Sequence, residues 1–142
     1  MAEFRFFHPV EVRYGDLDPQ GHLNNANYLT YFEQARIHYL INLGLFKDGG
    51  SFMDVGIILA DAHVTFLSIV RWEQDVRIGV RISRLGNKSM DSEYLMIDGG
   101  TDQELATGSS VLVAYDYGIG KTIPIPDEWR KKISKFEKIL TK

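Results

Sequence analysis

The sequence of 142 residues contains no cysteine, and this excludes disulfide bonds, thiolate nucleophiles and cysteine-type zinc sites. It also lacks any apolar run near the ~18 residues that a membrane-spanning helix needs. The N-terminal stretch MAEFRFFHPV has neither the basic start nor the apolar segment of a signal peptide. We therefore expect a cytoplasmic protein with no membrane span.

Nucleotide and metal motifs are absent as well. The sequence has no G-x-G-x-x-G or P-loop pattern, and its four histidines share no H-x-x-x-H spacing, so we expect no metal and no cofactor. A net charge of -3 gives no reason to expect a nucleic acid partner. The hydrophobic share of 44% and the length indicate one globular domain over residues 1–142.

Apolar and polar residues alternate with period two in several stretches, which is the pattern of half-buried strands. A first strand is expected over residues 4–13. Gly-Asn and Gly-Gly turns then separate segments that should pair as antiparallel hairpins. The later strands are expected over residues 57–67, 75–85, 89–98 and 105–116.

One long helix is expected over residues 26–43, because apolar side chains recur at helical spacing around much of its girth. Such a helix should be enclosed, and Gly44 should end it in a left-handed conformation. Residues 47–56 should form a loop, and the tail from Asp127 an amphipathic helix. These elements predict an α+β domain whose antiparallel sheet curls around the long helix.

The stretch over residues 13–36, RYGDLDPQGHLNNANYLTYFEQAR, is the richest in turn and cap residues. The chain should bend there and enter a helix near Ala26, which leaves Asp18 beside a helix N-terminus. Free backbone N–H groups at such a terminus suit an oxygen that gains negative charge, and a carboxylate beside them can attack an acyl carbon or activate water. For an isolated D-x-D-P-x-G turn, a purely structural role in capping is the more common one.

The segment DLDPQGHLNNANYLTYFEQAR resembles the active-site segment of hotdog-fold acyl-CoA thioesterases related to 4-hydroxybenzoyl-CoA thioesterase. The family pattern is an arginine or aromatic, then D-x-D-x-x-G-H-x-N-N-x-x-Y, an aromatic and E-x-A-R. The matching positions are Arg13, Asp16, Asp18, Gly21, His22, Asn24, Asn25, Tyr28, Tyr31, Phe32, Glu33, Ala35 and Arg36. The resemblance implies a hotdog fold, with a five- or six-stranded antiparallel sheet wrapped around one long central helix and a C-terminal helix.

Residue roles follow from this resemblance. Asp18 matches the catalytic carboxylate, either as the nucleophile or as the general base for water. Asn25 matches the position whose backbone N–H polarises the thioester oxygen, whereas Asn24 is expected to cap the helix. His22 has two open interpretations: it lines the acyl site, or it is a loop histidine bonded to backbone.

Other side chains of the motif have structural alternatives. Asp16 should turn away from Asp18, because adjacent carboxylates repel each other. Glu33 ranks second as a catalytic acid, since its spacing to Arg36 is that of an ordinary ion pair. His63 is expected at a packed surface or subunit contact. An acyl pocket would be walled by Tyr14, Tyr28, Tyr31 and Phe32, although Phe32 is favoured as core.

Coenzyme A carries phosphates, so the chain should supply cations near the site. The segment RLGNKSM resembles the family hairpin that meets the nucleotide, with Lys88 and Ser89 at its basic and hydroxyl positions and Arg84 nearby. A solvated hairpin tip is the alternative.

The sequence therefore predicts a thioester hydrolase that converts acyl-CoA, or another acyl thioester, to a free acid and coenzyme A. A hotdog hydratase or dehydratase and a non-catalytic acyl-binding protein are the alternatives. The strand over residues 57–66 should be a sheet edge, so we expect a homodimer or homotetramer.

Overall fold

The computed structural model describes residues 3–46 and 55–139. Its strands are β1 (Phe7–Val10), β2 (Val55–Phe66), β3 (Val76–Leu85), β4 (Ser89–Asp98), β5 (Glu104–Asp116) and β6 (Lys121–Thr122). Its helices are the short 3-10 helix η1 (Tyr14–Asp16), α1 (Asn27–Asn42) and α2 (Asp127–Glu137). None of the helices in these residues is long and apolar enough to cross a membrane.

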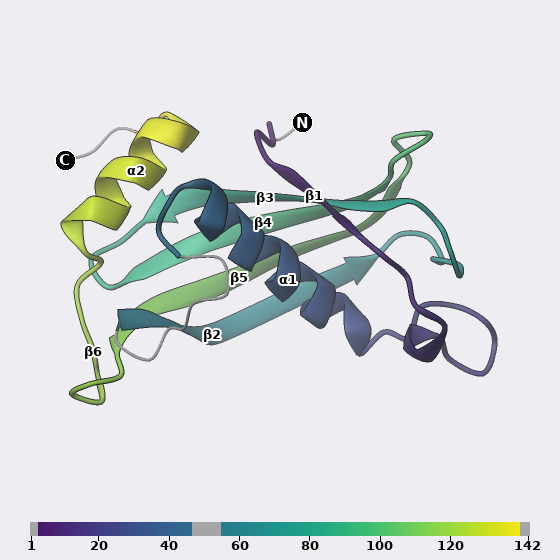
Figure 1. Cartoon of the computed structure of the whole chain (residues 1–142), viewed down its shortest axis with the longest axis horizontal. Coiled ribbons are helices and arrows are strands. Elements are labelled where there is room, and N and C mark those ends of the chain that lie inside the picture. Colours follow the sequence, from purple (N-terminus) through teal and green to yellow (C-terminus); the bar gives the residue numbers. More distant parts are fainter. Residues whose placement is uncertain (1–2, 47–54, 140–142) are drawn as a thin grey trace.

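The strands form one antiparallel sheet in the order β1-β3-β4-β5-β2, with β6 paired to β5. Figure 1 shows α1 lying across one face of this sheet and α2 near one end. β2 is the edge strand beyond β5, as the sequence predicts. The α+β architecture and its hairpins are therefore confirmed.

The core lies between α1 and the sheet, and period-two alternation builds it. The even-numbered residues from 76 to 82 in β3 and from 90 to 96 in β4, including Ile78, Ile82 and Met96, are buried. Phe32 of α1 stacks on Tyr94 with ring centroids 4.8 Å apart. β5 carries a glycine here because a Cβ at Gly108 would lie 2.5 Å from the Phe32 ring.

The helix α1 is less enclosed than its apolar sequence predicts. Its buried side chains are Tyr28, Tyr31, Phe32, Ala35, Arg36, Tyr39 and Leu40. Leu29 remains 43% exposed, and Glu33 is exposed as well. In a single chain the sheet covers only one side of α1, so the opposite side meets solvent.

Several element boundaries differ from the predictions. The first strand is limited to β1, because only those four residues pair with β3. Gly44 ends the long helix with φ +74°, as predicted. Of the expected loop over residues 47–56, residues 47–54 lie outside the described part of the chain, and the last two belong to β2. The short strand β6 was not expected as a separate element.

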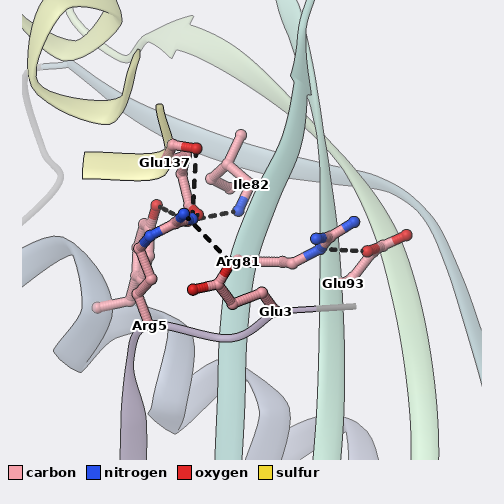
Figure 2. Close-up of polar contacts among 7 residues, drawn as sticks. Glu3, Arg5, Arg81, Ile82, Glu93 and Glu137 are labelled. Atoms are coloured by element: carbon pink, nitrogen blue, oxygen red, sulfur yellow. Dashed lines mark hydrogen bonds and ion pairs between the residues drawn. The ribbon is translucent and has the colours of Figure 1, made fainter. Parts of the chain in front are cut away.

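A buried carboxylate anchors α2 to the rest of the domain. Glu137 Oε2 accepts the hydroxyl of Tyr39 at 2.6 Å and the backbone N–H of Ile82 at 3.1 Å. Arg5 pairs with the other oxygen at 3.7 Å. Figure 2 shows Glu137 between Arg5 and Ile82. One side chain thus links α2 to α1, β3 and the N-terminal segment.

Candidate active site

The acidic segment folds back on itself as a closed loop between η1 and α1. Asp18 N–H donates to the carbonyl of His22 at 2.7 Å, and Gly21 N–H donates to the carbonyl of Asp18 at 3.0 Å. Leu17 and Leu23 form an isolated β-bridge at the neck of the loop. Gly21 has φ +81°, a conformation that suits glycine. The D-x-x-G spacing therefore has a structural cause.

Asp16 is buried and fully engaged. Its carboxylate accepts the Tyr31 hydroxyl at 2.6 Å and Arg13 Nη2 at 2.9 Å. The hydrogen bond from Arg13 is the main cause that lowers the pKa of Asp16 below its usual value. The prediction that Asp16 turns away from Asp18 is confirmed, and its partners extend beyond the turn to α1.

The backbone of Asp16 also positions the start of α1. Its carbonyl accepts the N–H of Asn24 at 2.9 Å and Asn27 Nδ2 at 3.0 Å. The loop and the first residue of α1 are therefore held by the same peptide group.

Asp18 is half-buried and only partly engaged. Its Oδ1 accepts backbone N–H groups of Gln20 at 2.9 Å and His22 at 3.1 Å. Its Oδ2 makes no hydrogen bond with any residue in the described ranges. The loop backbone thus orients a carboxylate and leaves one oxygen available for a reacting molecule.

A free donor lies at the start of α1. Asn24 Oδ1 accepts the N–H of Ala26 at 3.0 Å and so closes a turn just before the helix. The prediction that Asn24 caps the helix is wrong, because the N-cap residue is Ala26 and it receives no side-chain cap. Asn25 is exposed, and its backbone N–H makes no hydrogen bond within residues 3–46 and 55–139. Such a donor at a helix N-terminus can stabilise a developing oxyanion.

Tyr28 lies close enough to Asp18 for the carboxylate charge to affect the pKa of its hydroxyl. Burial is the main cause that raises the pKa of Tyr28, and the negative charge of Asp18 raises it further. Its ring packs edge-on against Phe66 at 4.8 Å. The structure therefore brings Tyr28 and the catalytic candidates of the loop together at one end of the sheet.

His22 contributes to the loop through its main chain. Its backbone forms a β-bridge with Arg71, in addition to the bonds with Asp18. Its imidazole makes no hydrogen bond to a described residue, so both interpretations of this side chain stay predictions. His8 and His38, by contrast, stack on each other at 3.8 Å, on β1 and α1.

Tyr14 does not line a buried pocket. Its side chain is 74% exposed, and its ring packs edge-on against Trp72 at 5.6 Å. Trp72 was missed by the sequence analysis, although a tryptophan in the polar turn between two strands is a visible signal. The two rings form an exposed aromatic pair beside the loop.

The hairpin residues lie far from Asp18 within one chain. Arg84, Lys88 and Ser89 are at the junction of β3 and β4, at the end of the sheet nearer α2 and opposite the acidic loop (Figure 1). Arg84 Nε pairs with Asp91 Oδ2 at 2.8 Å, so its charge is engaged. Lys88 is exposed. A single chain therefore does not bring these three residues to the loop.

Sequence reasoning also missed a buried polar cluster under α1. Arg36 Nη1 donates to the Tyr94 hydroxyl at 2.9 Å, and that hydroxyl also bonds Ser92 at 2.7 Å and Ser110 at 2.8 Å. The expected ion pair of Glu33 with Arg36 is present at 3.6 Å. Serines at inward positions of β4 and β5 were the available signal.

Two cavities lie at the surface of the described residues. A cavity of about 120 Å³, here named the Arg36 cavity, is lined by residues that include Leu29, Glu33, Arg36, Leu59, Ala62 and Ser110. A larger hollow of about 570 Å³ includes His63, Glu93, Thr107 and Ser109. Strand alternation places the larger hollow on the sheet face turned away from α1, apart from the loop. Within the described ranges, no three His, Asp or Glu side chains gather closely enough to hold a metal ion.

Comparisons with known proteins identify the family of the chain. The model of the thioesterase-like superfamily matches residues 12–133. The uncharacterized protein YsmA of Bacillus subtilis strain 168 is 30% identical over 134 residues, which are 93% of this chain and 87% of YsmA.

Two solved structures are similar over nearly the whole chain. A thioesterase from Thermus thermophilus, complexed with coenzyme A and Zn, is 32% identical with a TM-score of 0.82, over 99% of this chain and 100% of that one. A thioesterase superfamily protein from Jannaschia sp. CCS1 is 25% identical with a TM-score of 0.86, over 100% of this chain and 89% of that one. These likenesses and the sheet around α1 confirm the predicted hotdog fold.

Proposed function

The chain belongs to the thioesterase-like superfamily, and from this premise we propose that it is an acyl-CoA thioesterase. The reaction is hydrolysis of a thioester to a free carboxylic acid and coenzyme A. One observation carries the proposal: the loop backbone orients Asp18 with one oxygen free, and the same loop leads to the unbonded Asn25 N–H just before α1.

Each group has a role in the proposed reaction. The thioester oxygen accepts the N–H of Asn25, where the helix terminus stabilises the charge that develops on it. Asp18 then takes a proton from water as the water oxygen bonds to the acyl carbon. When the carbon–sulfur bond breaks, the departing thiolate receives that proton. In the covalent variant, an Asp18 oxygen bonds to the acyl carbon, the carbon–sulfur bond breaks and the coenzyme A thiolate leaves. Water then hydrolyses the resulting anhydride, which releases the free acid and regenerates the Asp18 carboxylate.

A coenzyme A thioester is supported as the substrate class by the Thermus thermophilus thioesterase, whose structure contains coenzyme A. In this chain, Lys88 is the exposed cation proposed to meet the coenzyme phosphates. Its position at the far end of the sheet requires a second chain for that contact.

We propose that a dimer supplies this contact. β2 is a 12-residue edge strand, and Leu59 and Phe66 on it are 49% and 52% exposed. If two β2 edges pair antiparallel, the start of one strand lies beside the end of the other. The hairpin between β3 and β4 of the second copy, which carries Lys88, then lies at the same end of the paired sheets as Asp18 of the first. Light scattering should show at least a dimer, and a monomer at micromolar concentration would contradict this.

A hydrolysis panel tests the proposed activity. Purified protein is incubated with acyl-CoA substrates that differ in length and polarity, and released thiol is measured. Thiol release that depends on enzyme concentration is expected for at least one substrate. Binding without thiol release would instead indicate a non-catalytic acyl-binding protein. Consumption of an enoyl-CoA double bond without thiol release would indicate a hydratase.

A further inference from the structure

Arg36 carries a buried charge whose hydrogen-bonding capacity is only partly used. The residue is only 6% exposed, although an arginine keeps its charge in a protein. Its Nη1 donates to a neutral partner, the Tyr94 hydroxyl. Its charged partner is Glu33, 3.6 Å from Nη2, whose side chain is 65% exposed and therefore screened by water. A buried charge is best stabilised by a close, hydrogen-bonded counter-ion, and this long ion pair leaves room for a better partner.

One edge of the guanidinium has no close partner among the described residues: it makes no hydrogen bond with them, and its only charged contact there is the long ion pair with Glu33. Arg36 Nε is buried and has no hydrogen-bond partner within the described part of the chain. Arg36 Nη2 lies 3.6 Å from Glu33 Oε2, which is too long for a hydrogen bond. Together Nε and Nη2 form the side of the guanidinium that can bind both oxygens of one carboxylate.

The Arg36 cavity adjoins this side chain. Its volume of about 120 Å³ corresponds to roughly four waters in the liquid, which is enough for a carboxylate and its neighbouring carbon atoms. Leu29 and Leu59 contribute apolar lining, and Ser110 contributes a hydroxyl. The cavity thus combines apolar walls with the cationic group of Arg36 and the anionic group of Glu33.

The Arg36 cavity lies further along α1 than the candidate active site. Leu29 lies one helical turn beyond Asn25, and Arg36 lies two turns further. Since side chains on a helix tilt toward its N-terminus, the guanidinium lies roughly 10–16 Å along the axis from Asn25. An extended acyl chain spans such a distance.

From these observations we infer that Arg36 is a specificity residue that binds a carboxylate at the distal end of the acyl group. The preferred substrates are then ω-carboxyacyl thioesters, with the thioester at Asp18 and the carboxylate on the Nε and Nη2 edge of Arg36. This inference rests on the proposed thioesterase function. Glu33, whose side chain is 65% exposed, moves toward solvent when the carboxylate binds.

The experiment compares matched substrates that differ only at the distal end. Succinyl-, adipoyl- and sebacoyl-coenzyme A are each paired with the butanoyl, hexanoyl or decanoyl thioester of the same length. Calorimetry with Asp18→Asn measures affinity without turnover. At least one dicarboxylate member should bind about tenfold or more tightly than its partner, as expected for a buried charge-assisted contact.

Variants test whether Arg36 causes the preference for dicarboxylate thioesters. Arg36→Met in the same background should remove the preference, whereas Glu33→Gln should keep it, because Glu33 is not the proposed ligand. Circular dichroism shows whether Arg36→Met folds. If it does not, Ala62→Leu is the test variant, because its larger side chain fills the cavity and leaves the guanidinium in place. Ala62→Leu should then remove the preference. A preference that survives Ala62→Leu would overturn the inference.

Failure of this inference is distinguishable from failure of the proposed function. Equal affinities within every pair would overturn the carboxylate subsite, while thiol release by the wild type from the alkyl substrates would still support a thioesterase. Conversely, a dicarboxylate preference in calorimetry without any thiol release by the wild type would support the subsite and contradict hydrolysis.

Discussion

Two buried carboxylates, Asp16 and Glu137, lie near opposite ends of α1 and have the same three kinds of interaction partner. Each accepts the hydroxyl of an α1 tyrosine at 2.6 Å, from Tyr31 and Tyr39 respectively. Each also accepts one backbone N–H and pairs with an arginine. In both cases the bond raises the pKa of the tyrosine, after burial as the first cause.

The difference lies in what each carboxylate holds. Asp16 pairs with Arg13 of its own turn and shapes a loop in which Asp18, two residues later, keeps a free oxygen. Glu137 joins α2 to distant elements, and both of its oxygens are engaged (Figure 2). The same interactions therefore shape the candidate catalytic loop at one end and a structural anchor at the other.

The largest expected effect is in the candidate catalytic loop. Asp18→Asn should lower turnover about a hundredfold or more, because the amide can neither attack the acyl carbon nor accept a proton. Folding and acyl-CoA binding should remain nearly unchanged, since asparagine keeps an oxygen for the loop N–H groups. Steady-state thiol release and thermal unfolding measure the two properties.

Glu33→Gln is the matched control for this change and should be milder, because Glu33 pairs with Arg36. If Asp18→Asn keeps wild-type turnover while Glu33→Gln loses it, the catalytic acid belongs to α1. If both variants stay active, the proposed role of the loop is wrong.

Next in size is the loss at the structural anchor. Glu137→Gln should lower the free energy of unfolding by about 2–3 kcal/mol, because it removes a buried charge that Tyr39, Ile82 and Arg5 contact. Urea denaturation measures the loss. Turnover per folded molecule should not change, and a fall of tenfold or more would show that α2 influences the site.

Asp16→Asn makes the corresponding change beside the site. It should cost about 1–2 kcal/mol, less than at Glu137, since the Arg13 side chain is 73% exposed and screened by water. Unlike Glu137→Gln, it should also lower turnover, because Asp16 positions the loop that carries Asp18. Unchanged turnover in a folded Asp16→Asn variant would refute this positioning role.

The contribution of Asp16 to stability should also depend on pH. The pKa of Asp16 in the folded protein is lowered from 3.8, chiefly by the hydrogen bond from Arg13. Its contribution to stability is therefore complete above pH 3.8 and is lost as the pH falls through the lower folded-state value. The stability gap between wild type and Asp16→Asn should narrow below pH 3.8 in urea titrations. A constant gap would argue against an ionised Asp16.

The smallest effect is expected at the distant hairpin. Lys88→Ala should raise the Michaelis constant for acyl-CoA and leave turnover at saturation unchanged, because phosphate contacts act equally on ground and transition states. An exposed contact of this kind contributes roughly 1 kcal/mol or less. Steady-state kinetics on the best substrate measures both constants. An unaltered Michaelis constant would place the nucleotide elsewhere.

The acidic loop and most element positions were predictable because their causes are local. Gly21 follows Asp18 by three residues, and its left-handed conformation closes the turn. Gly44 ends α1 in the same way. The enclosure of α1 was overestimated, since apolar periodicity does not say whether the second face is covered by the same chain.

The sequence by itself determined the α+β strand pattern, the bounds of α1 within one residue, and the candidate acid beside a helix start. These depend on contacts within a few positions of the chain. Only the tertiary structure decided that Tyr39 bonds Glu137 across 98 residues and that Arg36 bonds Tyr94 across 58. The tertiary structure also shows that the hairpin between β3 and β4 lies at the opposite end of the sheet from the acidic loop. No local pattern encodes such pairings, because they arise when the sheet order brings distant segments against one helix.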